Sequence, residues 1–278
     1  MRRLKIMKFV TDPILIVIVA IINLTPFFWS VQTSFKSERD VYVYPIKLVG
    51  FDVTMENYQY VLSGRFIDSL LVSLGYGLVS VLICVVLSSM AAYGFARFNS
   101  RMMSVLFFLV IFGIPLASGS SALIVPNYIL FSSLGITNKI FTMPLIYITY
   151  HLPISIWICM GGMRSIPIAV EEAAIIDGCK RSYIIFNLIP RLNKPALACS
   201  ALFTFISAWN EFLVSSVLTI SPQYRGIQVA VYYFMGYYGI QWGPLMTATA
   251  LSLIPIIFLF AFLGKQLISG LTAGAVKG

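Results

Sequence analysis

The sequence predicts an all-α membrane protein with about six transmembrane helices. Of its 278 residues, 59% are hydrophobic and only 10% are charged, and the mean hydropathy is +0.91. A soluble domain would carry about 25% charged residues. Lipid cannot hydrogen-bond a free backbone, so spanning segments are helices or the strands of a closed barrel. Barrel strands are alternating segments of ~10 residues. The apolar runs here are much longer and do not alternate, which favours helices.

Six apolar runs are long enough to cross a bilayer, because a hydrocarbon core of ~30 Å requires ~20 apolar residues per helix. The predicted spans are 13–31, 66–95, 102–124, 141–162, 195–220 and 243–264. With a loop at 163–194 and a tail at 265–278, they make one transmembrane domain over residues 1–278.

The basic residues predict how the chain lies across the membrane. With the N-terminus inside, 13 of the 19 Lys and Arg residues fall in cytoplasmic segments. An excess of Lys and Arg in cytoplasmic loops is the usual determinant of orientation. We therefore expect a multi-pass protein with both termini in the cytoplasm. The net charge of +9 is explained by this topology, and no nucleic-acid partner is expected.

Catalytic and metal-binding patterns are missing from the sequence. The four cysteines are scattered, His151 is the single histidine, and no Cys/His cluster has metal-ligand spacing. No Gly-x-x-x-x-Gly-Lys-Ser/Thr loop occurs, so the chain itself is not expected to bind nucleotide. We expect a non-enzymatic membrane subunit with no cofactor or metal of its own.

The loop at 163–194 is the most informative segment, since about thirty residues far exceed a simple helix connection. Pro167 stands where a proline opens a helix. Gly178 permits a left-handed turn after that helix. A second short amphipathic stretch follows, and Pro190 and Pro195 end it. The pattern predicts a helix–turn–helix hairpin on the cytoplasmic face.

The composition of this hairpin favours a protein partner over lipid. Glu171 and Glu172 stand in the first half of its first helix, where the helix dipole favours acids. Ala173 and Ala174 form a slim surface that another backbone can approach closely. Such a helix fits a groove on a soluble partner. The alternative, an interfacial helix lying on lipid, suits the acids and the small alanines less well.

The run Glu172-Ala173-Ala174-x-x-Asp177-Gly178 resembles the EAA signature of permease subunits in ABC importers. In that family the loop is a coupling helix pair that docks on the ATPase subunit. The resemblance implies ATPase-coupling roles for Glu172, Ala173, Ala174, Asp177 and Gly178. The chain departs from the family pattern after the turn: Cys179 replaces the usual alanine, and Pro190 comes one position early.

Other segments are similar to the carbohydrate-uptake branch of that family, in particular to its maltose-permease-like second subunit. They are 91–97, 208–213, 241–246 and 270–278. This resemblance implies a bacterial cytoplasmic-membrane importer that moves a sugar or oligosaccharide. It also implies a second permease subunit, two ATPase subunits that bind ATP and Mg, and an extracytoplasmic sugar-binding protein. The tail is expected to reach toward the ATPases.

Trp209, Asn210 and Glu211 are candidates for the substrate pathway. Glu211 is the one acid that the sequence sets well inside a predicted span, and such a residue is costly unless it has a function. Asn210 and Glu211 could bind sugar hydroxyls, and Trp209 could stack on a sugar face. A role of Glu211 in interhelical packing is equally compatible with the sequence.

Two alternatives to a sugar permease are a permease for a non-sugar solute and an ion-coupled secondary carrier. A secondary carrier should show several intramembrane acids or broken helices in two related halves. A third class, the membrane enzyme, lacks any supporting constellation, such as a Gly-x-Ser-x-Gly element.

Overall fold

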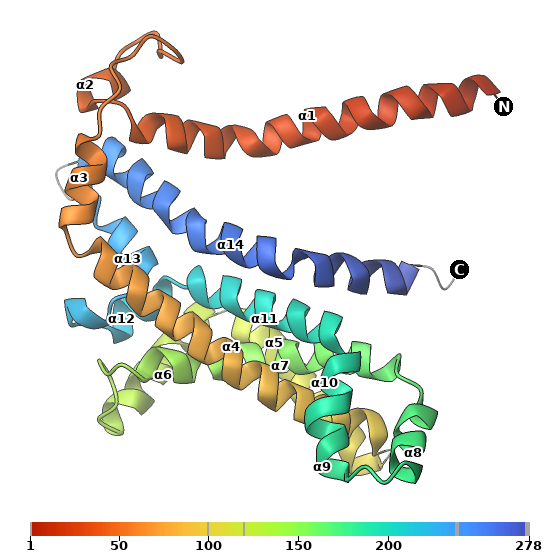
Figure 1. The fold of residues 1–278 in the computed structure, drawn as a ribbon. Helices are drawn as coiled ribbons and strands as arrows, with labels where there is room; N and C mark the ends of the chain where they lie inside the picture. The colour runs from red at the N-terminus through yellow and green to blue at the C-terminus, as the bar shows by residue number, and fades with distance from the viewer. Residues whose placement is uncertain (1, 99, 119, 237–238, 276–278) are drawn as a thin grey trace. The chain divides into compact units, whose positions relative to one another are not determined.

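The computed structural model describes residues 2–98, 100–118, 120–236 and 239–275, and these are mostly helical (Figure 1). They form two compact units. The first comprises Met1–Ile67 with Ala230–Ile254, and the second comprises Asp68–Val229 with Pro255–Gly278. The long helix α14 (Trp242–Ala275) contributes to both.

The first unit is built from the N-terminal helix α1 (Arg2–Ser34) and the start of α14. It also holds the short helices α2 (Glu38–Val41) and α3 (Glu56–Ser63) and the antiparallel pair β1 (Met235–Gly236) and β2 (Gly239–Ile240). Asn57 joins its parts, because its side-chain amide donates to the carbonyls of Ser34 and Lys36 at 3.0 and 2.8 Å.

A buried cation also holds the first unit together. Lys36 is only 2% exposed. Its ammonium donates to the Lys47 carbonyl at 2.7 Å and lies over the rings of Trp29 and Phe51 at 5.5 and 4.9 Å. Aromatic faces attract cations because their π-electrons carry negative charge. The rings therefore replace part of the hydration that Lys36 loses on burial.

The second unit is a bundle of longer helices. Its main members are α4 (Phe66–Arg97), α5 (Arg101–Ser118), α6 (Ser120–Ser133), α7 (Thr142–Arg164), α11 (Lys194–Trp209) and α12 (Leu213–Leu218). Between α7 and α11 lie α8 (Ile168–Ile176), α9 (Arg181–Tyr183), the π-helix Ile184–Leu188 and α10 (Ile189–Leu192). A 3-10 turn at Pro222–Tyr224 precedes α13 (Ile227–Tyr232).

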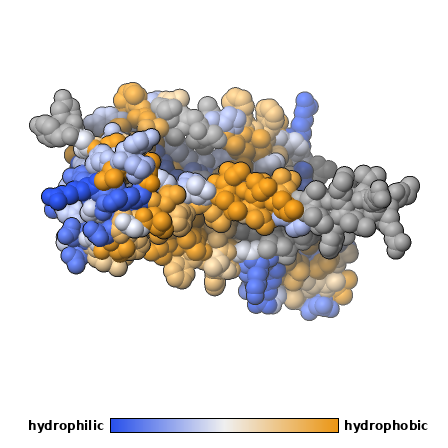
Figure 2. Space-filling view, turned by 90° about the horizontal axis from the view of Figure 1, so that it is seen from above, coloured by the Kyte–Doolittle hydropathy of each residue, from blue (hydrophilic) through white to orange (hydrophobic). Residues whose placement is uncertain are grey.

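Four of the six predicted spans match single helices that are long and apolar enough to cross a membrane. These helical segments are Pro13–Ser34, Phe66–Arg97, Thr142–Arg164 and Trp242–Gln266. Their outer surfaces are strongly apolar, with Leu82 67% exposed on α4 and Phe262 79% exposed on α14. Figure 2 shows hydrophobic side chains over much of the face turned to the viewer. Such surfaces suit lipid, and the chain is a multi-pass membrane protein.

The other two predicted spans consist of shorter helices. The predicted third span, 102–124, corresponds to α5 and the first turn of α6. The predicted fifth span, 195–220, is divided between two helices, because α11 ends at Trp209 and α12 starts only at Leu213. The predicted tail continues α14 as helix through Ala275, and residues 276–278 lie outside the described part of the chain.

The core of the second unit lies where α4, α6, α7, α11 and α12 meet. Its buried members are Tyr76, Phe131, Met143, Ile146, Tyr147, Tyr150, Ala208, Val214 and Leu218. Polar pairs cross between helices within the bundle: the Ser155 and Thr204 hydroxyls are 3.0 Å apart, and Ser88 lies 3.4 Å from the Cys159 sulfur. Small hydroxyl residues that hydrogen-bond across helices are typical of membrane bundles, since they allow close approach.

Helix α7 is tightly packed at Gly162 against the start of α11 and the residue before it. A Cβ atom added to Gly162 would overlap the Asn193 side-chain oxygen and lie 2.6 Å from the Ala196 methyl carbon. Asn193 cannot move aside easily, because it is 3% exposed and its amide donates to the Cys159 carbonyl at 3.0 Å. Because Gly162 has no side chain, α7 can pack tightly against the start of α11 at this point.

We predict that Gly162→Ala lowers the free energy of unfolding by about 1–3 kcal/mol, because the added methyl overpacks a rigid contact. Thermal unfolding of the detergent-purified protein measures the change. The matched control is Gly161→Ala, one position earlier, where nothing lies within 4 Å of the new methyl group. This control should be neutral or slightly stabilising, by up to ~1 kcal/mol. Equal effects of the two changes would contradict the close-packing explanation.

Candidate functional site

The segment between α7 and α11 is folded as a helical hairpin at one end of the second unit (Figure 1). Its first arm, α8, begins at Ile168 directly after Pro167, which adopts an extended conformation. The arm ends in a Schellman turn: Gly178 has φ +85°, its N–H donates to the Ile175 carbonyl at 3.0 Å, and the Cys179 N–H donates to Ala174 at 2.9 Å. The proline start and the glycine turn agree with the sequence prediction.

The second arm runs from α9 through the π-helix to α10. The Ile189 N–H donates to the Ile184 carbonyl, five residues back. A single π-turn accommodates one extra residue within a helix. Pro190 follows directly within the same helical run, so its missing N–H interrupts the α-helical hydrogen bonds next to the π-turn. The local π-turn thus lies in the same stretch where the sequence departs from the family spacing.

The hairpin has its own small core, which continues onto the end of α4. Met163, Ile166, Ile184 and Ile189 are buried in it, and Tyr93, Ala96, Ala174, Cys179 and Leu188 pack against them. The hairpin is therefore a packed part of the bundle and not a free loop.

The two neighbouring glutamates of α8 differ in exposure, because they lie on different faces of the helix. The Glu171 side chain is 8% exposed and forms an ion pair with Arg97 at 2.6 Å. Glu172 is exposed, as are Ala173, Asp177 and Gly178, while Ala174 is half-buried against the hairpin core. Large apolar side chains are exposed beside Glu172, with Ile176 85% and Ile175 48% exposed. Four of the five predicted coupling residues thus share an accessible surface that is partly apolar.

Sequence reasoning assigned no role to Glu171 and Arg97. The signal was available in the helical period: Glu171 and Ala174 are three positions apart and share the inward face, whereas Glu172 is turned about 100° away. The partner of Glu171 could not be deduced, because Arg97 is 74 residues away in the sequence.

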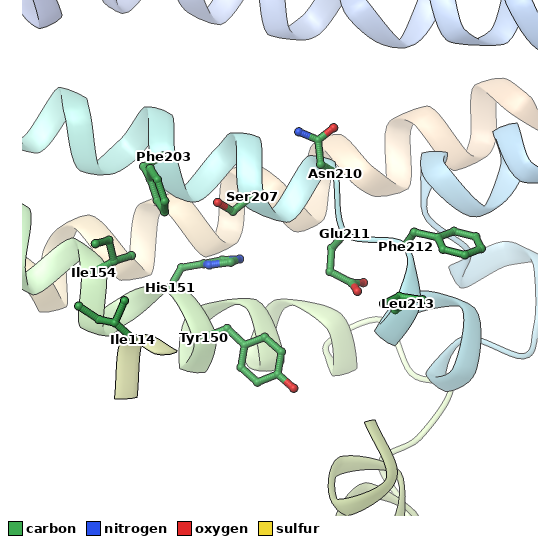
Figure 3. Close-up of a pocket in the computed structure, with 10 residues that line it drawn as sticks. All are labelled: Ile114, Tyr150, His151, Ile154, Phe203, Ser207, Asn210, Glu211, Phe212 and Leu213. Carbon is green, nitrogen blue, oxygen red and sulfur yellow. The ribbon is translucent and has the colours of Figure 1, made fainter. Parts of the chain in front are cut away.

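A second candidate site lies inside the bundle, where α7 faces the end of α11. A cavity of about 360 Å³ is lined by Ile114, Tyr150, His151, Ile154, Phe203, Ser207, Asn210, Glu211, Phe212 and Leu213 (Figure 3). Its volume falls in the ~300–1,000 Å³ range of small-molecule sites. The buried Nε2 atom of His151 has no hydrogen-bond partner within the described part of the chain. Polar groups thus converge on a largely apolar cavity.

The three predicted pathway residues occupy different environments. Trp209 is 1% exposed, and its ring stacks on Phe205 with the centroids 5.4 Å apart. Asn210 is exposed and lines the cavity, and Figure 3 shows its amide directed away from the Glu211 carboxylate. The Glu211 oxygens accept the Val214 and Ser215 N–H groups at 2.7 and 2.9 Å.

These two bonds explain why the chain can break after α11. The first N–H groups of α12 have no acceptor within their own helix. The Glu211 carboxylate is the acceptor for two of these groups. In a membrane bundle such groups have little water to bind, so the carboxylate stabilises the break. Glu211 has a structural function whether or not it also contacts a solute.

The architecture defines a class: a helical multi-pass membrane protein with a packed hairpin at one end of its bundle. The chain is 34% identical to the trehalose/maltose transport system permease protein MalG of Thermococcus litoralis, over 94% of each chain. It is 32% identical to the trehalose transport system permease protein SugB of Mycobacterium tuberculosis, over 92% of this chain and 93% of the relative. No family model matches the chain.

The chain belongs to the family of ABC transporter permease proteins. Its fold also matches a chain in the crystal structure of a bacterial ABC transporter involved in the import of the acidic polysaccharide alginate. The TM-score is 0.80 at 21% identity, with 95% of this chain and 97% of the other covered. The family resemblance read from the sequence is therefore correct.

We predict that Glu211→Ala lowers the free energy of unfolding by about 0.5–2 kcal/mol, as the loss of a helix cap does. Asn210→Ala, at the adjacent cavity residue, should leave the stability within about 0.5 kcal/mol of wild type. Thermal unfolding in detergent compares the two, and solute uptake by each variant completes the test. A fall in uptake with Asn210→Ala at unchanged stability supports a pathway role for this end of the cavity, whereas normal uptake contradicts it.

Proposed function

We propose that this chain is one of two permease subunits of a binding-protein-dependent importer for a sugar or oligosaccharide. The observation that carries the proposal is the hairpin at 163–194, whose EAA-type residues lie on an exposed, partly apolar surface. Relatives from several organisms support the sugar class, since they include a diacetylchitobiose uptake permease of Streptomyces coelicolor and a sulfoquinovosyl glycerol permease of Agrobacterium fabrum.

The energy source in this proposal is ATP hydrolysis by partner subunits, so the chain itself is not an enzyme and binds no cofactor. Two ATPase subunits, with ATP and Mg, would bind the hairpins of two permease subunits. Helix α8 would insert its exposed face, with Glu172, Ala173 and Ile176, into a groove of the ATPase. Gly178 would hold the turn at the tip, and Asp177 would lie beside it.

Substrate delivery would come from an extracytoplasmic sugar-binding protein. A related fold, at a TM-score of 0.64, occurs in the bacterial alginate ABC transporter in complex with an alginate pentasaccharide-bound periplasmic protein. The bacterial cytoplasmic membrane is the proposed location. The Lys and Arg distribution supports an orientation with both termini, and hence the hairpin, in the cytoplasm.

Within the membrane, the cavity lined by His151, Ser207, Asn210 and Glu211 is the proposed contribution of this chain to the solute path. Hydroxyl, amide and imidazole groups exchange hydrogen bonds with sugar hydroxyls, and the apolar lining suits the C–H faces of a sugar ring. Trp209 would act through packing beside the cavity, because its ring is buried. One permease cannot enclose a pathway alone, so the second subunit would complete it.

The complex of this chain with its second permease, ATPases and binding protein should show sugar-stimulated ATP hydrolysis and uptake when reconstituted in proteoliposomes. Uptake of labelled mono- and oligosaccharides identifies the substrate. Uptake driven by a proton or sodium gradient in the absence of ATPases would instead support the ion-coupled carrier. Uptake of a non-sugar solute alone would support a permease for a non-sugar solute.

We predict that Gly178→Asp reduces sugar-stimulated ATP hydrolysis at least roughly fivefold while membrane insertion remains normal. The substitution adds a charge at the turn and strains a left-handed position by ~1–3 kcal/mol. ATPase assays and membrane fractionation measure the two effects. Gly178→Asn is the control, since asparagine has nearly the shape of aspartate and a similar tolerance of this conformation but adds no charge. Wild-type coupling by the aspartate variant would argue against docking at the turn.

A further inference from the structure

We infer that Arg97 and Glu171 are positioning residues that connect the hairpin to helix α4 and bring that helix into the coupled motion. The inference rests on the proposed function, because it assigns a mechanical role within the same importer. The residues differ from those proposed to bind the ATPase, because Arg97 and Glu171 face the bundle and not a partner.

Glu171 is held from α4 by two side chains. The Arg97 Nε atom donates to one carboxylate oxygen at 2.6 Å, and the Tyr93 hydroxyl donates to the other at 3.1 Å. Tyr93 and Arg97 are four positions apart, so they lie one above the other on the same face of α4. Both oxygens of Glu171 are thus occupied by a single helix.

Arg97 also binds the hairpin at a second point. Its terminal amino group donates to the Ile166 carbonyl at 2.9 Å, in the short connection between α7 and α8. The planar guanidinium therefore joins the α7–α8 connection and the first arm to the end of α4. A lysine could not make both bonds with the same geometry, because its ammonium is a single point charge.

The ion pair is protected from water, which makes it strong and directional. The Arg97 and Glu171 side chains are 11% and 8% exposed. Tyr93 and Ala96 pack against the buried hairpin cluster that includes Ile184 and Ile189. Charge-assisted hydrogen bonds are about twice as strong as neutral ones. Removing one member of a buried pair leaves an uncompensated charge.

The contacts of Arg97 tie the hairpin to α4, a helix that is not adjacent to the hairpin in the sequence. The hairpin is covalently continuous with α7 and α11, whereas α4 ends at Arg97, about seventy residues earlier in the sequence. Helix α4 spans 32 residues, roughly 48 Å at 1.5 Å per residue, and can therefore extend from the headgroup region through the bilayer. A force on α8 reaches α4 through Glu171.

Helix α4 leads from the hairpin to the region of the cavity. Tyr76 of α4 belongs to the same buried cluster as Tyr147 and Tyr150, and Tyr150 lines the cavity with His151. At Gly77 the backbone of α4 comes so close to Phe205 of α11 that a Cβ would lie 2.9 Å from the ring. A rigid helix with such contacts transmits displacement along its length.

The test compares single and double variants of the pair in the reconstituted importer. Arg97→Met should reduce the amount of assembled complex, because it leaves Glu171 buried and unpaired. Adding Glu171→Gln removes that charge, so the double variant should recover assembly. If the ion pair transmits movement from the hairpin to α4, the double variant should still transport at least fivefold less sugar per ATP hydrolysed than the wild type. Recovered assembly with a wild-type ratio of uptake to hydrolysis would overturn the inference.

Two further variants keep the test decisive. Arg101→Met makes the same charge change at an exposed residue at the start of α5 and should leave the ratio unchanged. Tyr93→Phe removes only the hydroxyl bond to Glu171 and should lower the ratio about twofold. If the double variant fails to assemble, an unchanged ratio in Tyr93→Phe rejects the inference.

The wild-type complex separates this inference from the proposed function. Absence of sugar-stimulated hydrolysis in wild type would reject the importer itself. Normal wild-type coupling together with a fully coupled double variant would reject only the role of Arg97 and Glu171.

Discussion

A hydrocarbon environment gives no hydrogen bonds to a polypeptide backbone, and the arrangement of this chain depends on that constraint. The long spans meet it with uninterrupted helices. Where the helix is interrupted, after Trp209, a side chain supplies what the backbone lacks, since the Glu211 carboxylate accepts two N–H groups of α12. The same acid borders the cavity, so one residue serves both the break and the polar lining.

Close packing of the helices sets a second condition, which small residues meet. Gly162 lets α7 and α11 touch beside Asn193, and Gly77 does the same for α4 and Phe205. Lipid provides no hydrophobic force to press helices together, so close contact and short polar bonds stabilise the bundle. The hairpin begins next to the Gly162 contact, and its base therefore lies at a tightly packed contact between α7 and the start of α11.

The first arm of the hairpin presents two different faces because of its helical geometry. One face of α8 carries Glu171 and Ala174 toward the bundle, and the other carries Glu172, Ala173 and Ile176 outward. A partner can therefore bind the outer face without disturbing the inner contacts. In the proposed importer, transmission of movement would require both faces, because a hairpin that bound the ATPase without contacts to its own bundle would not move the pathway helices.

The sequence by itself determined the helical membrane class, four helices long enough to span, the proline-started and glycine-turned hairpin, and the family. These follow from local chemistry: hydrophobic length, the conformational limits of proline and glycine, and a contiguous motif. Tertiary structure alone decided that the fifth span breaks after Trp209, that Trp209 is buried, and that Glu171, not Glu172, pairs with Arg97. Each of these depends on contacts between residues distant in the chain, or on a side chain competing with the helix for backbone N–H groups. A pattern of apolar residues contains neither kind of information.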